Sequence, residues 1–181
     1  FRTQAKYANV KPLVIRIDDV GRAEAVAYDA AAYRPQAPEL RYFLTRFVAM
    51  HFSRLRATIQ HDYPDSLFFL DPTLANATIA QNEQSRVIET FLTNASDDEV
   101  DIEVKNVTFG ELSKSPYKAS VDFEKHYLAL GTRQERKRET YVAQVDFVLR
   151  EHVPNEFVRV NPLGLQIEYF RVDQAFEERR Q

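Results

Sequence analysis

The sequence predicts an α+β domain in which helices pack against a curved four-stranded antiparallel sheet, preceded by an N-terminal hairpin. Two patterns support this prediction. Between about positions 39 and 92 apolar residues recur at three- and four-residue steps, which is typical of helices. From position 99 onward they recur at every second position, which is typical of strands that bury one face. Because the helices precede the strands, the simplest packing wraps the sheet around the long helix as a cone.

The N-terminal region is predicted to be a loose arm followed by a β-hairpin. Residues 1–10 show no hydrophobic period, so we expect an arm there. Between residues 11 and 28 the large apolar residues alternate, and the segment 18–21 (Asp-Asp-Val-Gly) supplies turn-forming residues. We expect one domain over residues 11–176 and a short tail over residues 177–181.

A long helix is predicted from about Glu39 to Gln60. Pro38 suits a first helical position, and Glu39 places a negative charge in the first turn, where it interacts favourably with the helix dipole. The apolar stripe is broad enough to require a large partner surface. Its residues are Leu40, Phe43, Leu44, Phe47, Val48, Leu55 and Ile59.

A second helical segment is predicted from about Thr73 to Leu92. Pro64 is expected to interrupt the chain before it. Asp71 followed by Pro72 is typical of a helix start, because the carboxylate can accept a hydrogen bond from a free backbone N–H. The middle of the segment, residues 80–86, is polar, so we expect this helix to be half-buried or broken.

Four strands are predicted in the C-terminal half. The first begins at Glu99, and its apolar positions change parity between Val104 and Val107, which indicates a β-bulge. A charged connection over residues 131–139 separates the second strand from the third. The inward positions of these two strands are Tyr117, Ala119, Val121, Phe123, Tyr141, Ala143, Val145, Phe147 and Leu149.

The fourth strand is entered through a stiff corner, Asn161-Pro162-Leu163-Gly164, called the Asn-Pro corner below. Pro162 fixes its own φ and pushes the preceding residue toward extended geometry, while Gly164 can adopt a positive φ. We expect the corner to serve both the fold and protein–protein interaction. Its Leu163 side chain either contacts a partner or packs into the core.

The strand after the corner changes parity. Leu165, Ile167 and Tyr169 are expected on one face, but the next apolar residues, Phe170 and Val172, have the opposite parity. This pattern predicts a β-bulge near Tyr169 and Phe170, or a strand that is covered on both faces.

The composition bounds the function. The chain has 181 residues and a net charge of −3 with both signs mixed, which argues against a dedicated nucleic-acid-binding protein. It has no cysteine, which excludes disulfides and cysteine-ligated metals and is compatible with an oxidising compartment. No apolar run in the sequence is long enough to span a bilayer.

The sequence indicates no catalytic, cofactor-binding or metal-binding residues. The histidines are His51, His61, His126 and His152. They are widely spread and lack the spacing of a zinc or metalloprotease site. With only four glycines a phosphate cradle is not expected. The basic run 133–138 favours a solvated hairpin tip over a contact with phosphate or an acidic partner.

Several segments together carry a resemblance to a known family. They are residues 117–125 (Tyr-Lys-Ala-Ser-Val-Asp-Phe-Glu-Lys), the basic hairpin, residues 141–149, and the Asn-Pro corner with its strand to Asp173. The opening strand 14–18 and the helix start 40–44 agree with them. This combination resembles the periplasmic domain of the VirB-eight/TrbF family, which are bitopic inner-membrane components of type IV secretion and conjugation machines.

The resemblance implies a nuclear-transport-factor-two-like (cystatin-like) cone and a structural role in assembly without catalysis or a cofactor. It implies other secretion subunits as partners, weak homodimerisation, no direct contact with nucleic acid, and an inner-membrane location with this domain in the periplasm. It also implies one membrane helix upstream of Phe1, for which we expect about 20 apolar residues.

A second function class remains open at this stage. Cone-shaped folds also serve as small-molecule-binding proteins, isomerases and dehydratases, and a fold alone does not decide function. Such an enzyme would need a carboxylate or a His–Asp pair on the inward face of the sheet. The expected inward positions are apolar or aromatic, and Asp122 and Asp146 fall on the outward parity. We therefore expect an assembly component.

Overall fold

The computed structural model describes residues 13–17, 23–27, 36–94 and 97–175, in two compact units, 1–34 and 35–181, which are treated separately. In the first unit, β1 (Leu13–Ile17) pairs antiparallel with β2 (Ala23–Ala27). This pairing confirms the predicted hairpin. The predicted arm, the hairpin turn 18–21 and the tail lie outside the described residues.

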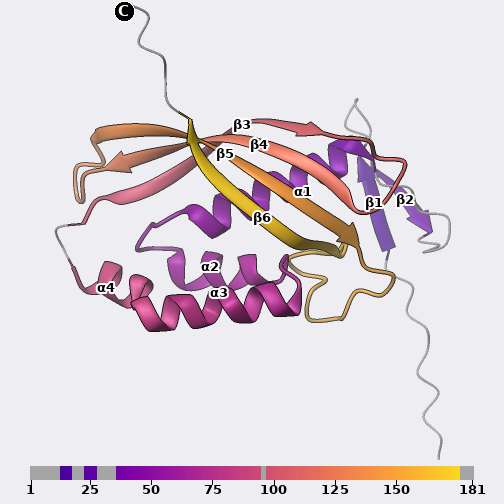
Figure 1. Ribbon diagram of the computed structural model, residues 1–181, viewed down its shortest axis with the longest axis horizontal. Helices are drawn as coiled ribbons and strands as arrows, with labels where there is room; N and C mark the ends of the chain where they lie inside the picture. Colours follow the sequence, from indigo (N-terminus) through magenta and orange to yellow (C-terminus); the bar gives the residue numbers. More distant parts are fainter. Residues whose placement is uncertain (1–12, 18–22, 28–35, 95–96, 176–181) are drawn as a thin grey trace, which may run out of the picture. The chain divides into compact units, whose positions relative to one another are not determined.

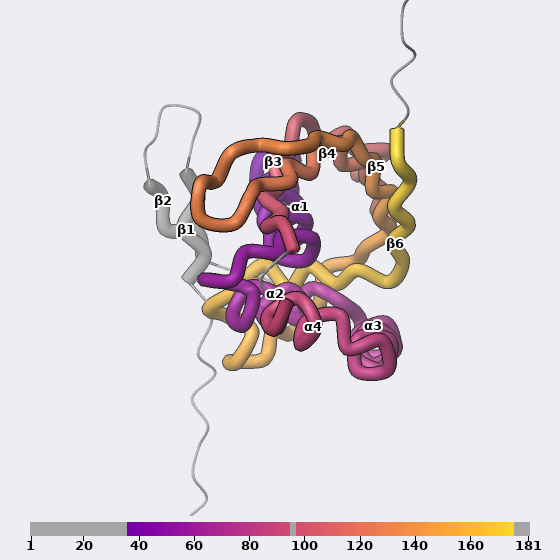
Figure 2. Tube along the Cα trace, turned by 90° about the vertical axis from the view of Figure 1, so that its left-hand side faces the viewer, coloured from indigo at the N-terminus to yellow at the C-terminus, as the bar shows by residue number. Residues whose placement is uncertain are grey.

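The second unit contains four helices and a four-stranded sheet. The helices are α1 (Ala37–Phe52), α2 (Ile59–Leu67), α3 (Pro72–Ser85) and α4 (Val87–Thr93). The strands are β3 (Glu99–Phe109), β4 (Tyr117–Leu128), β5 (Glu135–Leu149) and β6 (Leu165–Ala175). They form an antiparallel meander in the order β3-β4-β5-β6, as predicted. The sheet arches over α1, and α2, α3 and α4 lie on the other side of α1 (Figure 1, Figure 2).

The core lies between α1 and the concave face of the sheet. Leu40, Leu44, Phe47 and Val48 are fully buried, which confirms the predicted stripe. Ring contacts join the helix to the sheet: Phe52 stacks on Phe123 with ring centres 5.3 Å apart. Aromatic packing of this kind adds to the gain from burying apolar area.

The prediction that one helix continues to Gln60 is wrong, because α1 ends at Phe52. Beyond Ser53 the chain extends, and Arg54 exchanges two backbone hydrogen bonds with Val100 of β3, at 2.8 and 2.9 Å. The Arg54 guanidinium donates to the carbonyl oxygens of His51 and Ser53, at 2.9 and 2.7 Å. These bonds replace the lost helical ones, and the apolar spacing continues because Ile59 is buried at the start of α2.

The following helices agree with the sequence except at Pro64. Pro64 lies inside α2, so the prediction that it interrupts the chain is wrong; its ring removes one helical hydrogen bond, and the helix ends three residues later. The Asp71 carboxylate caps α3 by accepting a hydrogen bond from the Leu74 N–H at 2.8 Å, as predicted. Arg86 takes a left-handed conformation, with φ of 50°, and breaks the helical segment between α3 and α4, also as predicted.

The register shifts in each of the three strand pairs of the sheet, and two of these shifts bear on the predicted bulges. The register of β3 against β4 shifts between Val104 and Asn106, which confirms the first predicted bulge. In β6, Tyr169 faces Asp146 and Ile167 faces Phe147, so the extra residue is Glu168. This second bulge lies directly before the predicted pair. The placement of Tyr169 beside Leu165 and Ile167 is therefore wrong: Tyr169 is 52% exposed, and Leu165 and Ile167 are fully buried.

The bulge in β6 also turns Phe170 toward the helix. Its ring meets Phe47 at 5.9 Å and His51 at 5.4 Å between ring centres. At the other side of the sheet, β5 begins at Glu135, so the charged connection is shorter than the predicted 131–139. Residues 135–139 join the strand because they pair with β4 from Leu128 to Lys125.

His51 is buried in the core as a neutral hydrogen-bond donor. Its Nδ1 lies 2.9 Å from the Ser66 Oγ, and that hydroxyl donates to the Tyr63 carbonyl oxygen at 2.6 Å. Because the hydroxyl proton is already used, Nδ1–H must donate to Ser66. Burial, with a smaller contribution from the Arg54 charge, lowers the pKa of His51 from 6.5 to about 3.

This burial predicts a pH-dependent stability. The unfolded chain binds a proton at His51 below about pH 6.5, whereas the folded chain does so only near pH 3. The stabilisation is complete above pH 6.5 and decreases as the pH falls toward 3, with a slope of up to about 1.4 kcal/mol per pH unit. Urea unfolding between pH 4 and 7.5 measures this slope. We expect His51→Gln to reduce it and the exposed His61→Gln to leave it unchanged; equal slopes in all three proteins would contradict the assignment.

Candidate functional site

The Asn-Pro corner is tied to both the sheet and the helices through Asn161. The Asn161 side chain is fully buried; its Nδ2 donates to the carbonyl oxygens of Phe68 and Leu165, at 3.1 and 2.8 Å. Its Oδ1 accepts from the Leu165 N–H at 3.0 Å. One amide therefore joins the corner to the end of α2 and to the start of β6. Replacing it would leave buried backbone groups without partners.

Gly164 completes the corner in a conformation that favours glycine. Its φ is +66°, and a Cβ added there would lie 2.7 Å from the Val153 Cγ2 and 3.2 Å from the Arg150 Cβ. The Gly164 carbonyl accepts from the Arg150 N–H at 2.9 Å. The corner therefore requires both the backbone freedom and the small volume of glycine.

Leu163 packs into the core of this chain, at 5% exposure. Of the two alternatives in the sequence analysis, the structure therefore favours core packing for Leu163. The surface near the corner is provided instead by residues 150–160, including the exposed Val158. This loop is held against α2 by the pair Arg159–Asp65 at 2.8 Å and by the Phe68 and Phe157 rings, whose centres are 4.9 Å apart.

The space between α1 and the sheet is filled by side chains. Its inward strand positions Val121, Phe123 and Phe147 are fully buried. Asp146 lies on the outward face, where it pairs with Lys118 at 2.7 Å. The buried His51 stays neutral down to about pH 3, since its pKa is lowered that far. His51 is therefore no acid or base for catalysis near neutral pH, and the titratable Lys125 on this face lies against the Phe52 and Tyr141 rings.

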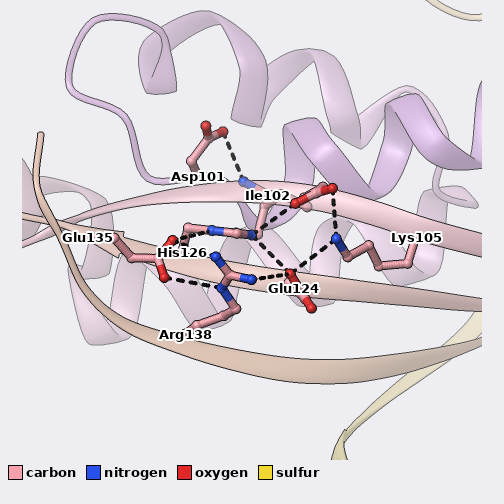
Figure 3. A network of polar contacts seen from close by, with 8 residues as sticks. Asp101, Ile102, Lys105, Glu124, His126, Glu135 and Arg138 are labelled. Carbon is pink, nitrogen blue, oxygen red and sulfur yellow. Dashed lines mark hydrogen bonds and ion pairs between the residues drawn. The ribbon is translucent and has the colours of Figure 1, made fainter.

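A polar network covers the outer face of the sheet, across β3, β4 and β5. Figure 3 shows His126 between Glu124 and Glu135, with Arg138 contacting both carboxylates. Three potential metal ligands, from Glu103, Glu124 and His126, lie within 4.8 Å of one another. Salt bridges to Lys105 and Arg138 lower the pKa of Glu103 and Glu135, respectively. This network was not predicted from the sequence, where its signal was the two-residue spacing of Glu124 and His126 on one strand face.

The basic run 133–138 is used largely within the chain. Arg133 reaches Glu99 at 3.6 Å, Arg136 reaches Asp98 at 3.3 Å, and Arg138 reaches Glu135 at 3.1 Å. These arginines remain at least half exposed, so each pair stabilises the fold only weakly. The arrangement agrees with a solvated hairpin end.

A groove with apolar walls lies between α2, α3 and α4, and is called the helical groove below. Its volume is about 710 Å³, and its walls include Leu67, Ile79, Ile88 and Leu92. Beneath it, Ile59, Tyr63 and Phe91 form a small buried cluster. No residue of α3 is buried, so the outer wall of the groove is itself well exposed.

Among the described helices, none combines the length and apolar character needed to cross a membrane.

This architecture defines an α+β, nuclear-transport-factor-two-like domain with a filled interior, and solved structures share it. The soluble domain of TrwG of the type IV secretion machinery from Bartonella grahamii aligns with a TM-score of 0.66 and 18% identity, over 78% of this chain and 96% of that one. TraE in complex with 2-(2-furyl)isonicotinic acid aligns with a TM-score of 0.65 and 17% identity, over 79% of this chain and 100% of that one. VirB8 of Agrobacterium tumefaciens aligns with a TM-score of 0.59 and 15% identity, over 76% of this chain and 91% of that one.

The sequence itself assigns the family. Residues 2–175 match the VirB8 protein family, so the chain belongs to it. The resemblance drawn from the strand and corner motifs is thereby confirmed, and the chain is an assembly component of a type IV secretion system. A comparison with curated protein sequences found no match.

Gly164 allows a sharp test of the corner against a matched control. Gly131 has a similar positive φ, +88°, but a Cβ there would meet nothing within 4 Å. Gly131→Ala should cost about 1 kcal/mol of unfolding free energy from backbone strain alone. Gly164→Ala should lower the unfolding free energy by about 1–3 kcal/mol more than Gly131→Ala does, because the new methyl overlaps Val153. Chemical denaturation of both variants measures the difference; equal losses would show that the close packing is unimportant.

Proposed function

We propose that this chain nucleates and positions other type IV secretion subunits on the periplasmic side of the inner membrane, through its surfaces and without catalysis. The observation that supports this most is where the apolar surface lies. The helix–sheet interior is filled by aromatic and aliphatic side chains, while the helical groove leaves apolar walls open to the outside. Exposed apolar hollows with polar rims are typical of protein–protein contacts.

The helical groove has the composition of an interaction site. Ile79 on α3 lines the groove and is 37% exposed. The rim carries Glu83, Arg86 and Glu89, with Arg86 and Glu89 paired at 3.0 Å. An apolar centre surrounded by charged residues is the usual anatomy of a partner-binding surface. We propose that another secretion subunit docks here.

The rival enzyme function receives no support from the described site residues. A small-molecule enzyme on this fold would place an acid or a base between helix and sheet. His51 is the buried histidine of that region, and its hydrogen bond to Ser66 and its lowered pKa keep it neutral. TraE, a protein of the same fold, has been seen with a small aromatic acid. We propose that the activity of this chain consists of binding other subunits.

Charge placed in the groove tests this role. Ile79→Asp should reduce secretion or conjugation by about tenfold or more, because an unpaired charge would be buried at the contact. The unfolding free energy should change by less than about 0.5 kcal/mol, since Ile79 lies on a helix without buried residues. The matched control is Leu130→Asp, at a similarly exposed apolar residue (44%) after β4.

The comparison requires the two variants to be introduced into the full-length gene and to reach equal cellular levels. Transfer in cells and thermal unfolding of the purified chain are then measured together. Normal transfer by Ile79→Asp would remove the groove from the proposal. An equal loss with Leu130→Asp would mean that the effect is not specific to the groove.

We further propose that a single membrane helix precedes Phe1 and that residues 11–176 form the periplasmic domain. The family membership supports this location, since VirB8-type domains are periplasmic parts of inner-membrane proteins. We also propose that the Asn-Pro corner contributes to assembly indirectly. By holding Val160 and the loop before it against α2, Asn161 fixes the exposed surface around Val158.

Weak self-association of this chain is the expected consequence of its family. Most large apolar side chains are buried in the core, so a dimer interface formed by the others should be small. Its dissociation constant should be about micromolar. Sedimentation velocity from low to high micromolar concentration, at constant salt, measures this equilibrium. The sedimentation coefficient should rise with concentration. A strictly monomeric profile across the range would contradict homodimerisation by this chain alone.

A further inference from the structure

The outer face of the sheet brings a histidine and two carboxylates to one point. Glu103 on β3 and Glu124 on β4 are directly opposite each other in the strand register, and His126 follows two residues later on the same face. The intervening Lys125 points to the other face, where its Nζ lies 5.6 and 4.3 Å from the ring centres of Phe52 and Tyr141. The cluster therefore results from strand pairing and not from flexible surface side chains alone.

Glu135 fixes which nitrogen of His126 carries the proton. The His126 Nδ1 lies 2.7 Å from the Glu135 Oε2, as Figure 3 shows. An ionised carboxylate only accepts hydrogen bonds, so Nδ1 is the protonated nitrogen. In the neutral imidazole, Nε2 then presents a lone pair to the opposite side. A carboxylate that orients a histidine in this way is a common support for a metal ligand.

The other ring nitrogen of His126 lies close to two further carboxylate oxygens. Its Nε2 is 3.2 Å from the Glu124 Oε2 and 3.3 Å from the Glu103 Oε2. Both Nε2 and the Glu124 Oε2 are buried atoms without a hydrogen-bond partner. Three potential electron-pair donors therefore converge on one point, where they could share a cation.

The spacing fits a metal ion. Tetrahedral zinc, with bonds of about 2.0–2.1 Å to nitrogen and oxygen, places its ligand atoms about 3.3 Å apart. The two distances from Nε2, 3.2 and 3.3 Å, agree with this value. A proton shared along either contact would need hydrogen-bond geometry, which neither contact has. We propose that Glu103, Glu124 and His126 bind a divalent transition-metal ion, with zinc as the best fit.

Lys105 acts as a competing cation at this site. Its ammonium lies 2.8 Å from the Glu103 Oε1 and 3.4 Å from the Glu124 Oε2. Lys105 is the bulged residue of β3 and its side chain is 42% exposed, so it can move into solvent. With Lys105 displaced, the charge of a divalent ion and that of Arg138 balance the carboxylates Glu103, Glu124 and Glu135. The fourth coordination position is then taken by water.

Zinc titration of the chain by calorimetry, after treatment with a chelator, tests the proposal. We expect one ion per chain and a rise in melting temperature on binding. His126→Gln and Glu103→Gln should each weaken binding about tenfold or more, and Glu135→Gln should weaken it through loss of orientation by about 10–100-fold. His152→Gln, at an exposed histidine, is the matched control and should bind as the parent does.

The variant Lys105→Met tests the site while leaving all three proposed metal ligands in place. It should bind zinc more tightly than the parent chain, because the competing ammonium is gone, and cobalt should give the visible absorption of a tetrahedral site. Circular dichroism of each variant confirms folding. Binding that is equally strong in His126→Gln, or unchanged in Lys105→Met, would overturn the assignment. So would a parent chain that binds no zinc in the titration.

Discussion

The packing of α1 against the concave face of the sheet is the interaction on which the rest of this domain depends. The helix contributes a fully buried stripe, and the sheet closes over it with inward residues from β4, β5 and β6. The ring contacts of Phe47 and Phe52 with Phe170, at 5.9 and 6.2 Å, exist because the bulge at Glu168 rotates the strand at the right position. Without that extra residue Phe170 would point outward and the helix would lose an aromatic neighbour.

Much of this architecture could be predicted from local patterns in the sequence. The strand order, the cap at Asp71, the break near Arg86 and the bulge after Val104 each leave a signal within a few residues. The end of α1 could not be predicted in this way. The apolar spacing continues through Leu55 and Ile59, whereas the break at Ser53 depends on a pairing between Arg54 and Val100, which are far apart in sequence.

The functional features also differ in whether local sequence or only tertiary contacts reveal them. The Asn-Pro corner could be recognised because proline and glycine restrict or free the backbone locally, and in the structure Asn161 bonds to Phe68 and Leu165. The outer-face network required strand register, since Glu103 and Glu124 are brought together only by pairing across β3 and β4. The helical groove required the relative placement of three helices, to which the weakly periodic α3 gives little guidance.

The two short bridges outside the main strands have a consequence for assembly. Arg54 pairs with Val100 at the β3 edge, and Leu70 pairs with Ile167 at the β6 edge, where Asp71 also donates to the Ile167 carbonyl at 2.8 Å. Each open edge of the sheet is therefore already occupied at one point by the chain itself. A strand from another subunit could not continue the ladder past these positions. Pairing with a strand of another subunit would thereby be confined to the stretches of β3 after Val100 and of β6 after Ile167.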